Sequence, residues 1–275
     1  LRLAAFPHQD LRELAALVRA GEHPAATLAQ EAMKLREAGA AVIGIVAIAV
    51  ALARETHERL ARHGRSLLVI GRARAPEREA LAAEVMAACA TNTRQAGREP
   101  LYVVATQTIE VGLDLDFDAL VTELAPVSAL RQRFGRLDRL GELGESRAAI
   151  VLRPDAALPY GKAALQEAQT WLRGQEKTLK GVGKGVDFGI AALPEPPPET
   201  AARAPRLLPD DLDLLFDPDF DLDVTPYLHG ERRVLDVQLV WRAALDDLPP
   251  EDWTEAVESV PPRGLEMMSV PVSAA

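Results

Sequence analysis

The chain has 275 residues, of which 48% are hydrophobic and 4% aromatic, and its formal net charge is −10. This length allows one α/β domain with an appendage, and no apolar run reaches the roughly 18 residues that a membrane-spanning helix needs. The single cysteine, Cys89, excludes an internal disulfide and fits a reducing cytoplasm.

The first two thirds of the chain alternate between helical and strand patterns. Residues 8–38 are typical of two helices that meet near 21–24, and residues 41–50 (AVIGIVAIAV) are typical of a strand buried on both faces of a parallel sheet. Helices are expected at 52–62, 76–90, 126–140 and 162–173, and further strands at 67–71, 101–106, 119–124 and 148–152. Strands that alternate with helices predict a doubly wound α/β fold.

The composition changes from about residue 181. The glycines of 181–185 and the prolines of 194–198 indicate a flexible linker. We expect the acidic segment 208–223 to be solvated and partly disordered rather than to serve as a docking peptide or a DNA-mimicking strand. Residues 234–245 predict one further strand, whereas 265–275 is expected to end without a closing element.

These patterns divide the chain into four parts. We predict a helical lead-in at 1–40, the main α/β domain at 41–180, an acidic linker at 181–224 and a small, truncated module at 225–275. Residues 186–275 carry 6 basic and 19 acidic residues, whereas residues 1–185 carry 25 and 22. The acidity therefore belongs to the tail, and the main domain is close enough to neutral to follow a phosphate backbone.

A polar turn follows the apolar strand at 101–106. Thr106, Gln107 and Thr108 stand where that strand leaves the sheet, and ligands gather outside the carboxyl ends of parallel strands. Gly112 allows a close backbone approach. We interpret Glu110 as a residue that keeps the loop in shape, and the aspartates at 116 and 118 as caps and turn residues.

The next notable segment, QRFGRLDR at 132–139, is expected to be helical. At about 100° per residue, Gln132, Arg136 and Arg139 lie within roughly 60° of one another. The opposite side is apolar and carries Leu130, Phe134 and Leu137. A face with two fixed positive charges suits a polyphosphate. The alternative is a surface helix with ordinary ion pairs worth about 0–1 kcal/mol each, and on either reading Arg131 and Arg133 are expected to be solvated.

Together, VVATQTIEVGLDLDFD at 103–118 and QRFGRLDR at 132–139 resemble motifs V and VI of superfamily 2 helicases. With LVTELAP at 120–126, the match resembles most the CRISPR-associated helicase–nuclease of type I systems, over residues 41–153. The resemblance implies the fold of the RecA-like C-terminal lobe of P-loop-NTPase-type helicases. That fold is a mostly parallel sheet flanked by helices, here followed by a small irregular C-terminal extension.

The resemblance also implies roles for individual residues. Gln132 would reach the γ-phosphate or the attacking water, and Arg136 and Arg139 would act as arginine fingers. Asp114 would face the ribose or link the nucleotide to motif VI. The implied nucleotide-binding set is Gly112, Asp114, Gln132, Arg136 and Arg139. The implied nucleic-acid set is Thr106, Gln107, Thr108, Arg72 and Arg78, although the two last arginines could instead form salt bridges with Glu77 or Glu79.

The missing motifs limit what this chain is expected to do alone. It has no GxxxxGK[ST] phosphate loop and no Asp-Glu dipeptide, and it offers no metal site of its own. We therefore expect ATP with Mg²⁺ to be held mainly by a first RecA-like lobe, and we expect no hydrolysis by this fragment, which opens at Leu1 rather than Met.

Several partners and two alternatives remain open. The resemblance implies single-stranded DNA, the first lobe, a CRISPR surveillance complex and an HD-type nuclease domain as partners, and no membrane. One alternative is a lobe of a DNA repair helicase or restriction translocase. The other is a truncated, non-catalytic binding module that uses the acidic tail.

Overall fold

The computed structural model describes residues 11–71, 73–89, 100–110, 114–153, 160–189, 191–194, 208–216 and 236–271. The chain forms two compact units. The first comprises Leu1–Gly71 and Glu77–Pro197, and the second comprises Arg72–Pro76 and Pro198–Ala275. Within the described residues, no helix is both long and apolar enough to cross a bilayer.

The first unit is built on an eight-stranded sheet with the order β3-β4-β2-β5-β6-β1-β8-β7. The strands from β3 to β1 run parallel to their neighbours, and β8 is antiparallel to both β1 and β7. Their bounds are β1 Arg12–Arg19, β2 Val42–Val46, β3 Arg65–Val69, β4 Leu101–Ala105, β5 Ala119–Glu123, β6 Glu145–Leu152, β7 Lys177–Leu179 and β8 Gly183–Asp187. The predicted α/β class with a mostly parallel sheet is confirmed.

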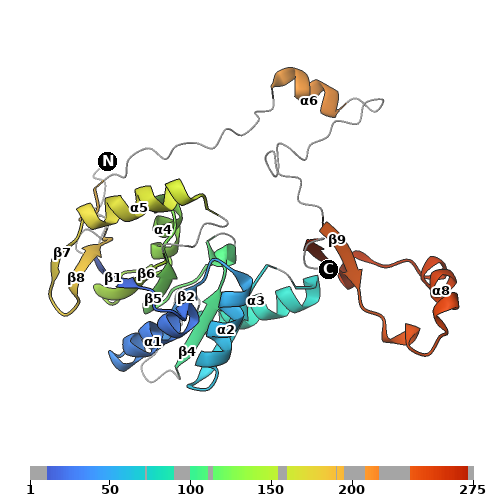
Figure 1. Ribbon diagram of the computed structural model, residues 1–275, viewed down its shortest axis with the longest axis horizontal. Helices are drawn as coiled ribbons and strands as arrows, with labels where there is room; N and C mark the ends of the chain where they lie inside the picture. The colour runs from blue at the N-terminus through green and yellow to red at the C-terminus, as the bar shows by residue number, and fades with distance from the viewer. Residues whose placement is uncertain are drawn as a thin grey trace, which may run out of the picture. The chain divides into compact units, whose positions relative to one another are not determined.

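Helices cover both faces of this sheet, and the sheet separates α1 and α2 from α4 and α5 (Figure 1). Successive strand residues point to opposite faces, so Ile43 and Ile45 of β2 pack with α1 and α2, whereas Val42 and Val46 pack with α3, α4 and α5. The helix bounds are α1 Pro24–Glu37, α2 Val50–Leu60, α3 Ala75–Cys89, α4 Val127–Phe134 and α5 Lys162–Gly174. Burial on both faces explains the continuous apolar run of β2.

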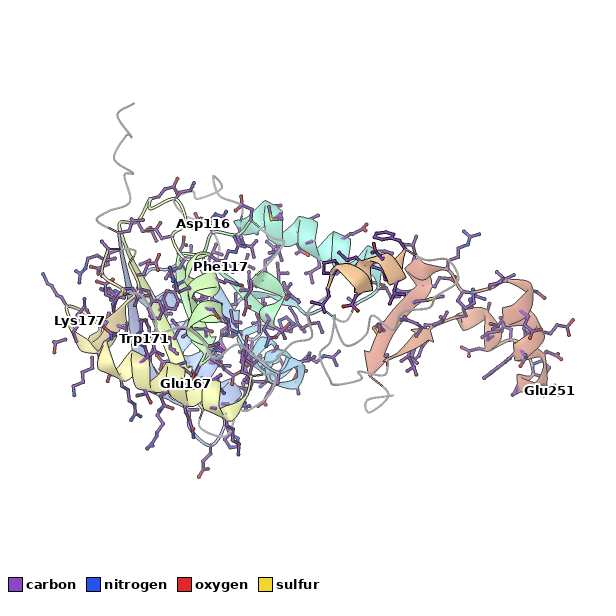
Figure 2. All side chains as sticks on the ribbon, turned by 90° about the horizontal axis from the view of Figure 1, so that it is seen from above. Asp116, Phe117, Glu167, Trp171, Lys177 and Glu251 are labelled. Atoms are coloured by element: carbon purple, nitrogen blue, oxygen red, sulfur yellow. The ribbon has the colours of Figure 1, made fainter. Side chains whose placement is uncertain are left out.

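One glycine sets the spacing on the α4 side of the sheet. A Cβ atom at Gly44 would lie 2.6 Å from the ring of Phe117, which is fully buried. The ring therefore occupies the space that a β2 side chain would otherwise fill. Figure 2 labels Phe117 beside Asp116, on the segment that enters β5.

The predicted helix over the first part of residues 8–38 is wrong, because Arg12–Arg19 forms strand β1. This strand pairs with β6 along its whole length and with β8 on its other side. Alanine and leucine favour a helix in isolation, but β6 and β8 offer backbone partners on both edges of this segment. The second predicted helix is confirmed as α1.

The glycine-rich segment 181–185, predicted as a flexible linker, instead leads into strand β8. Gly181 and Gly183 adopt positive φ angles of 79° and 86° in the turn after β7. A Cβ atom at Gly185 would overlap the carbonyl oxygen of Ala15 on β1. These glycines therefore permit a tight turn and a close strand approach.

The second unit contains short elements. Its described helices are α6 Pro209–Leu215 and α8 Trp253–Ser259, and its described 3₁₀ turns are η2 Ala243–Leu245, η3 Pro250–Asp252 and η4 Gly264–Glu266. The predicted strand at 234–245 is confirmed as β9 Asp236–Val240. The expectation that the chain ends without a closing element is wrong, since β10 Met267–Pro271 pairs antiparallel with β9.

Candidate functional site

The loop that leaves the carboxyl end of β4 is anchored to the neighbouring strand. The backbone N–H of Thr106 and the hydroxyl of Thr108 both donate to the carbonyl oxygen of Val69 at the end of β3, over 3.2 and 3.0 Å. Gln107–Ile109 then form the 3₁₀ turn η1. Thr106 is buried, while Gln107 and Thr108 are half-buried. The polar turn thus stands at the predicted strand end, with its first hydroxyl turned inward.

The second motif is only partly helical. Helix α4 ends at Phe134, so the predicted helix to residue 140 is wrong. Beyond it, Leu137 forms a parallel bridge with Phe117, whose N–H donates to the carbonyl oxygen of Arg136 over 2.8 Å. Asp138 follows with a positive φ of 41°. Gln132, Arg136 and Arg139 therefore do not share one helix face, because pairing with the segment before β5 replaces the last helical turn.

Both arginines nevertheless lie beside the loop that follows β4. The Nη2 atom of Arg136 donates to the carbonyl oxygen of Glu110 over 3.1 Å. The Nη1 atom of Arg139 lies 2.9 Å from the carboxylate of Asp114, and the Arg139 side chain is 39% exposed. Neither guanidinium is sealed in the core. Asp114 thus joins the loop after β4 to the second motif through this ion pair. Gln132 is exposed on α4.

The electrostatics of this pair favour an anion. Burial lowers the pKa of Arg136, the nearby positive charge of Arg139 lowers it further, and Asp114 partly offsets both effects. The Nε atom of Arg136 is buried without a hydrogen-bond partner. A phosphate beside the two guanidinium groups would relieve the repulsion between them.

Arg133, predicted to be solvated, is fully buried. Its Nε donates to Glu110 over 2.8 Å, and its Nη2 donates to the hydroxyl of Tyr160 over 2.9 Å. Its Nη1 donates to the hydroxyl of Thr122 over 2.7 Å and to the carbonyl oxygen of Glu123 over 3.1 Å. Sequence reasoning missed this network. The available signal was a Thr-Glu pair at the end of an otherwise apolar strand.

The aspartates before β5 act as the caps and turn residues that the sequence suggests. Asp118 accepts the N–H groups of Ala41 and Val42 over 2.9 and 2.8 Å, which fixes the start of β2. Asp116 accepts the N–H of Arg139 over 2.9 Å. Both carboxylates therefore accept hydrogen bonds from backbone N–H groups, and Asp116 thereby fixes the backbone position of Arg139.

Glu123 at the end of β5 was also missed by sequence reasoning. It is 1% exposed, and its carboxylate accepts the N–H of Ile48 over 2.6 Å and lies 3.3 Å from Arg153. Burial raises its pKa, which the Ile48 N–H and the charges of Arg153 and Arg133 partly oppose. The carboxylate ties the end of β5 to the turn that follows β2, where the sequence offers no polar side chain.

Residues of the second motif also line a cavity of about 500 Å³. The rings of Phe134 and Phe188 stack there with centroids 3.8 Å apart. Burial, together with the nearby charges of Asp138 and Asp187, raises the pKa of Glu13 to about 8. The other charged groups that line the cavity are Arg131 and Arg139.

Of the remaining predicted site residues, only Arg78 is among those that the structure describes. Arg78 lies exposed on α3, and no described contact joins it to the two motifs. Gly112 and Arg72 lie outside the described residues.

Residues 37–142 match the family model described as the C-terminal part of the CRISPR-associated nuclease/helicase Cas3. A putative CRISPR-associated nuclease/helicase Cas3 of Myxococcus xanthus is 39% identical over 121 residues, which is 42% of this chain and 15% of that protein. A putative Cas3 of Methanocaldococcus jannaschii is 37% identical over 90 residues, or 31% of this chain and 12% of that protein. The chain thus spans a small share of the length of these relatives.

Solved structures agree with this similarity. The crystal structure of T. fusca Cas3-AMPPNP superimposes with a TM-score of 0.52 and 27% identity, and the match covers 70% of this chain and 24% of that one. The structure of T. fusca Cas3-ATP gives a TM-score of 0.51 at 27% identity, over 63% of this chain and 22% of that one. Both matched segments are therefore much shorter than the solved chains.

Proposed function

Since the chain carries the C-terminal region of a CRISPR-associated superfamily 2 helicase, we propose that it is the second motor lobe of an ATP-dependent DNA helicase. That helicase would unwind targeted DNA for degradation in a type I CRISPR system and would work in the cytoplasm. A first RecA-like lobe would face this one across the nucleotide, a CRISPR surveillance complex would load the protein, and an HD-type nuclease domain would cut the strand.

One observation carries the proposal: Arg136 and Arg139 stand together beside the loop that follows β4. Among the residues that the structure describes, the buried Nε of Arg136 has no hydrogen-bond partner, and the guanidinium of Arg139 pairs with the half-exposed carboxylate of Asp114. These groups fit the terminal phosphates of ATP, because guanidinium groups bind phosphate oxygens with paired hydrogen bonds. The family's T. fusca structures with ATP and AMPPNP support a nucleotide as the ligand.

The bound ATP·Mg²⁺ would supply the phosphoryl group and neutralise part of its charge. Arg136 and Arg139 would then hold the oxygens on which charge grows, and Gln132 would orient the attacking water. Asp114 would release Arg139 when the phosphate competes for it, because an exposed ion pair is worth only about 0–1 kcal/mol. Gly112 and Asp114 would lie along the nucleotide.

The turn after β4 would contact single-stranded DNA. Gln107 and Thr108, both half-buried, can reach a sugar–phosphate backbone, and such contacts position a strand without reading its sequence. Thr106 would act through its backbone, because its side chain is buried. We propose Arg72 and Arg78 as further phosphate contacts. Closing of the two lobes around ATP and reopening after hydrolysis would step the protein along the strand.

The first experiment replaces Arg136 with alanine in the two-lobe protein and measures DNA-stimulated ATP hydrolysis. An arginine finger is worth about 10³–10⁵ in rate, so kcat should fall at least about 10³-fold while DNA affinity changes little. Arg65→Ala is the matched control, since Arg65 forms only a surface ion pair with Glu84. If kcat of the Arg136→Ala protein fell less than about tenfold, the finger assignment would fail.

The second experiment uses this chain alone. Mixed with ATP, Mg²⁺ and single-stranded DNA, it should release phosphate at the background rate, because the sequence contains no phosphate loop. Robust turnover would contradict the assignment of ATP and Mg²⁺ binding to a first lobe.

A further inference from the structure

Arg133 is the least accessible charged group beside the proposed site. Its side chain is 0% exposed, and its ion-pair partner Glu110 is 12% exposed. A buried charge is tolerated only when it is paired and hydrogen-bonded. All three of its guanidinium nitrogens donate to a partner within 3.1 Å.

The partners of Arg133 come from separate parts of the first unit. Glu110 belongs to the loop after β4, Thr122 and Glu123 belong to the end of β5, and Tyr160 precedes α5. The hydrogen bonds of Arg133 therefore connect different elements and do not complete any one of them. The guanidinium instead fixes three segments against one another at one point.

One of these segments orients a proposed finger. The carboxylate of Glu110 accepts a hydrogen bond from the Nε of Arg133 over 2.8 Å. The backbone carbonyl oxygen of the same Glu110 accepts one from the Nη2 of Arg136 over 3.1 Å. That carbonyl is the only hydrogen-bond partner of the Arg136 side chain among the contacts described. The direction of Arg136 therefore depends on the backbone of residue 110, which the buried ion pair holds.

We propose that Arg133 is a positioning residue, which sets the finger Arg136 through Glu110 and does not itself touch the nucleotide. Tyr160 completes the arrangement by holding the far nitrogen of Arg133. The proposal rests on the proposed function, because it requires Arg136 to act on a phosphate.

The fork of the guanidinium explains why arginine is needed here. Its planar nitrogens reach Glu110, Thr122 and Tyr160 at once, whereas the ammonium of a lysine is a single point charge on a flexible stem. Lys at this position would keep the charge but leave at least two buried partners without a donor. Arg133→Lys is therefore expected to behave as a defect in geometry rather than in charge.

The decisive experiment is a double-mutant cycle in the two-lobe protein, with Glu110→Gln and Arg136→Ala. Glu110→Gln removes the charge that Arg133 holds and keeps the size of the side chain and the backbone carbonyl. By itself it should lower kcat for DNA-stimulated ATP hydrolysis about tenfold or more, while KM for ATP and the Kd for single-stranded DNA change less than about threefold. In the Arg136→Ala background it should change kcat less than about twofold, because the finger that it positions is absent.

The outcomes separate this inference from the proposed function. If Arg136→Ala leaves kcat unchanged, the proposed function fails, and the positioning role fails with it. If Arg136→Ala lowers kcat but Glu110→Gln has no effect, or has the same effect in both backgrounds, only the positioning role fails. Thermal unfolding of each variant shows whether a loss of kcat reflects loss of folded protein.

A second pair of variants covers the case in which Glu110→Gln does not fold. Tyr160→Phe removes one hydroxyl from the network and should lower kcat about threefold with KM unchanged. Tyr102→Phe is the control, because Tyr102 is a buried tyrosine that packs on the α1–α2 side of the sheet, away from Arg133. Equal kcat values for the two tyrosine variants would overturn the role given to Tyr160 and Arg133.

Discussion

Replacing Glu13 with glutamine tests the electrostatics of the cavity beside the second motif. Burial, together with the charges of Asp138 and Asp187, raises the pKa of this carboxyl from 4.5 to about 8. Asp187 is itself near Arg12, at 3.7 Å, while Arg131 and Arg139 line the cavity from the side of the second motif. The native protein therefore keeps a proton on Glu13 at neutral pH.

The sign of the effect follows from proton linkage. Below pH 4.5 the carboxyl is protonated in both the native and the unfolded state, so it does not affect stability. Between pH 4.5 and 8 the unfolded chain has released the proton and the native chain has kept it, so the free energy of unfolding falls as pH rises. At about 1.36 kcal/mol per pH unit, the loss between pH 4.5 and pH 7 is about 3 kcal/mol.

Glutamine has nearly the same shape as protonated glutamate and no acidic proton to release. Glu13→Gln should therefore leave the free energy of unfolding nearly unchanged at pH 4.5 and raise it by about 3 kcal/mol at pH 7. Urea titrations of this chain followed by far-UV circular dichroism at both pH values measure the difference. Glu84→Gln is the control, since Glu84 is 47% exposed in a surface pair and should shift stability by less than about 1 kcal/mol. An equal gain at both pH values, or none at pH 7, would refute the reasoning.

Two further predictions concern packing and the link between the motifs. Gly44→Ala places a Cβ atom 2.6 Å from the ring of Phe117, so it should lower the free energy of unfolding by about 1–3 kcal/mol, measured by urea titration. The control Gly174→Ala, where no atom lies within 4 Å, should be neutral or slightly stabilising. Asp114→Asn breaks an ion pair with Arg139 whose side chains are 52% and 39% exposed, so the thermal midpoint should move by no more than about 2–4 °C; a larger fall would mean that the pair is structural.

Much of the main sheet could be predicted from the sequence. The run at 41–50 contains β2, and the shorter runs at 101–106 and 119–124 contain β4 and β5, because strands covered on both faces contain few polar residues. The polar turn after β4 was also placed correctly, because parallel strands bring their carboxyl ends to one edge of the sheet.

The candidate site was predicted only in part. Arg136 and Arg139 lie beside the loop after β4, as expected, but they reach it from an extended segment rather than from a helix face. The error arose because the apolar period of 130–137 fits a helix whether or not the last turn forms. The backbone bridge between Leu137 and Phe117 takes the place of that last helical turn. The roles of these residues in nucleotide and DNA binding stay predictions.

By itself, the sequence determined the class of fold, since this depends on hydrophobic period, and it supplied the proposal for the residues that carry the chemistry, since this depends on side-chain type. Only the tertiary structure decided that Arg12–Arg19 is a strand and that Arg133 is buried. A segment rich in alanine and leucine can satisfy its backbone hydrogen bonds within a helix or across to neighbours, and the neighbours here are more than a hundred residues away. A guanidinium is buried only where its partners converge, and those of Arg133 lie between 10 and 27 positions away in the chain.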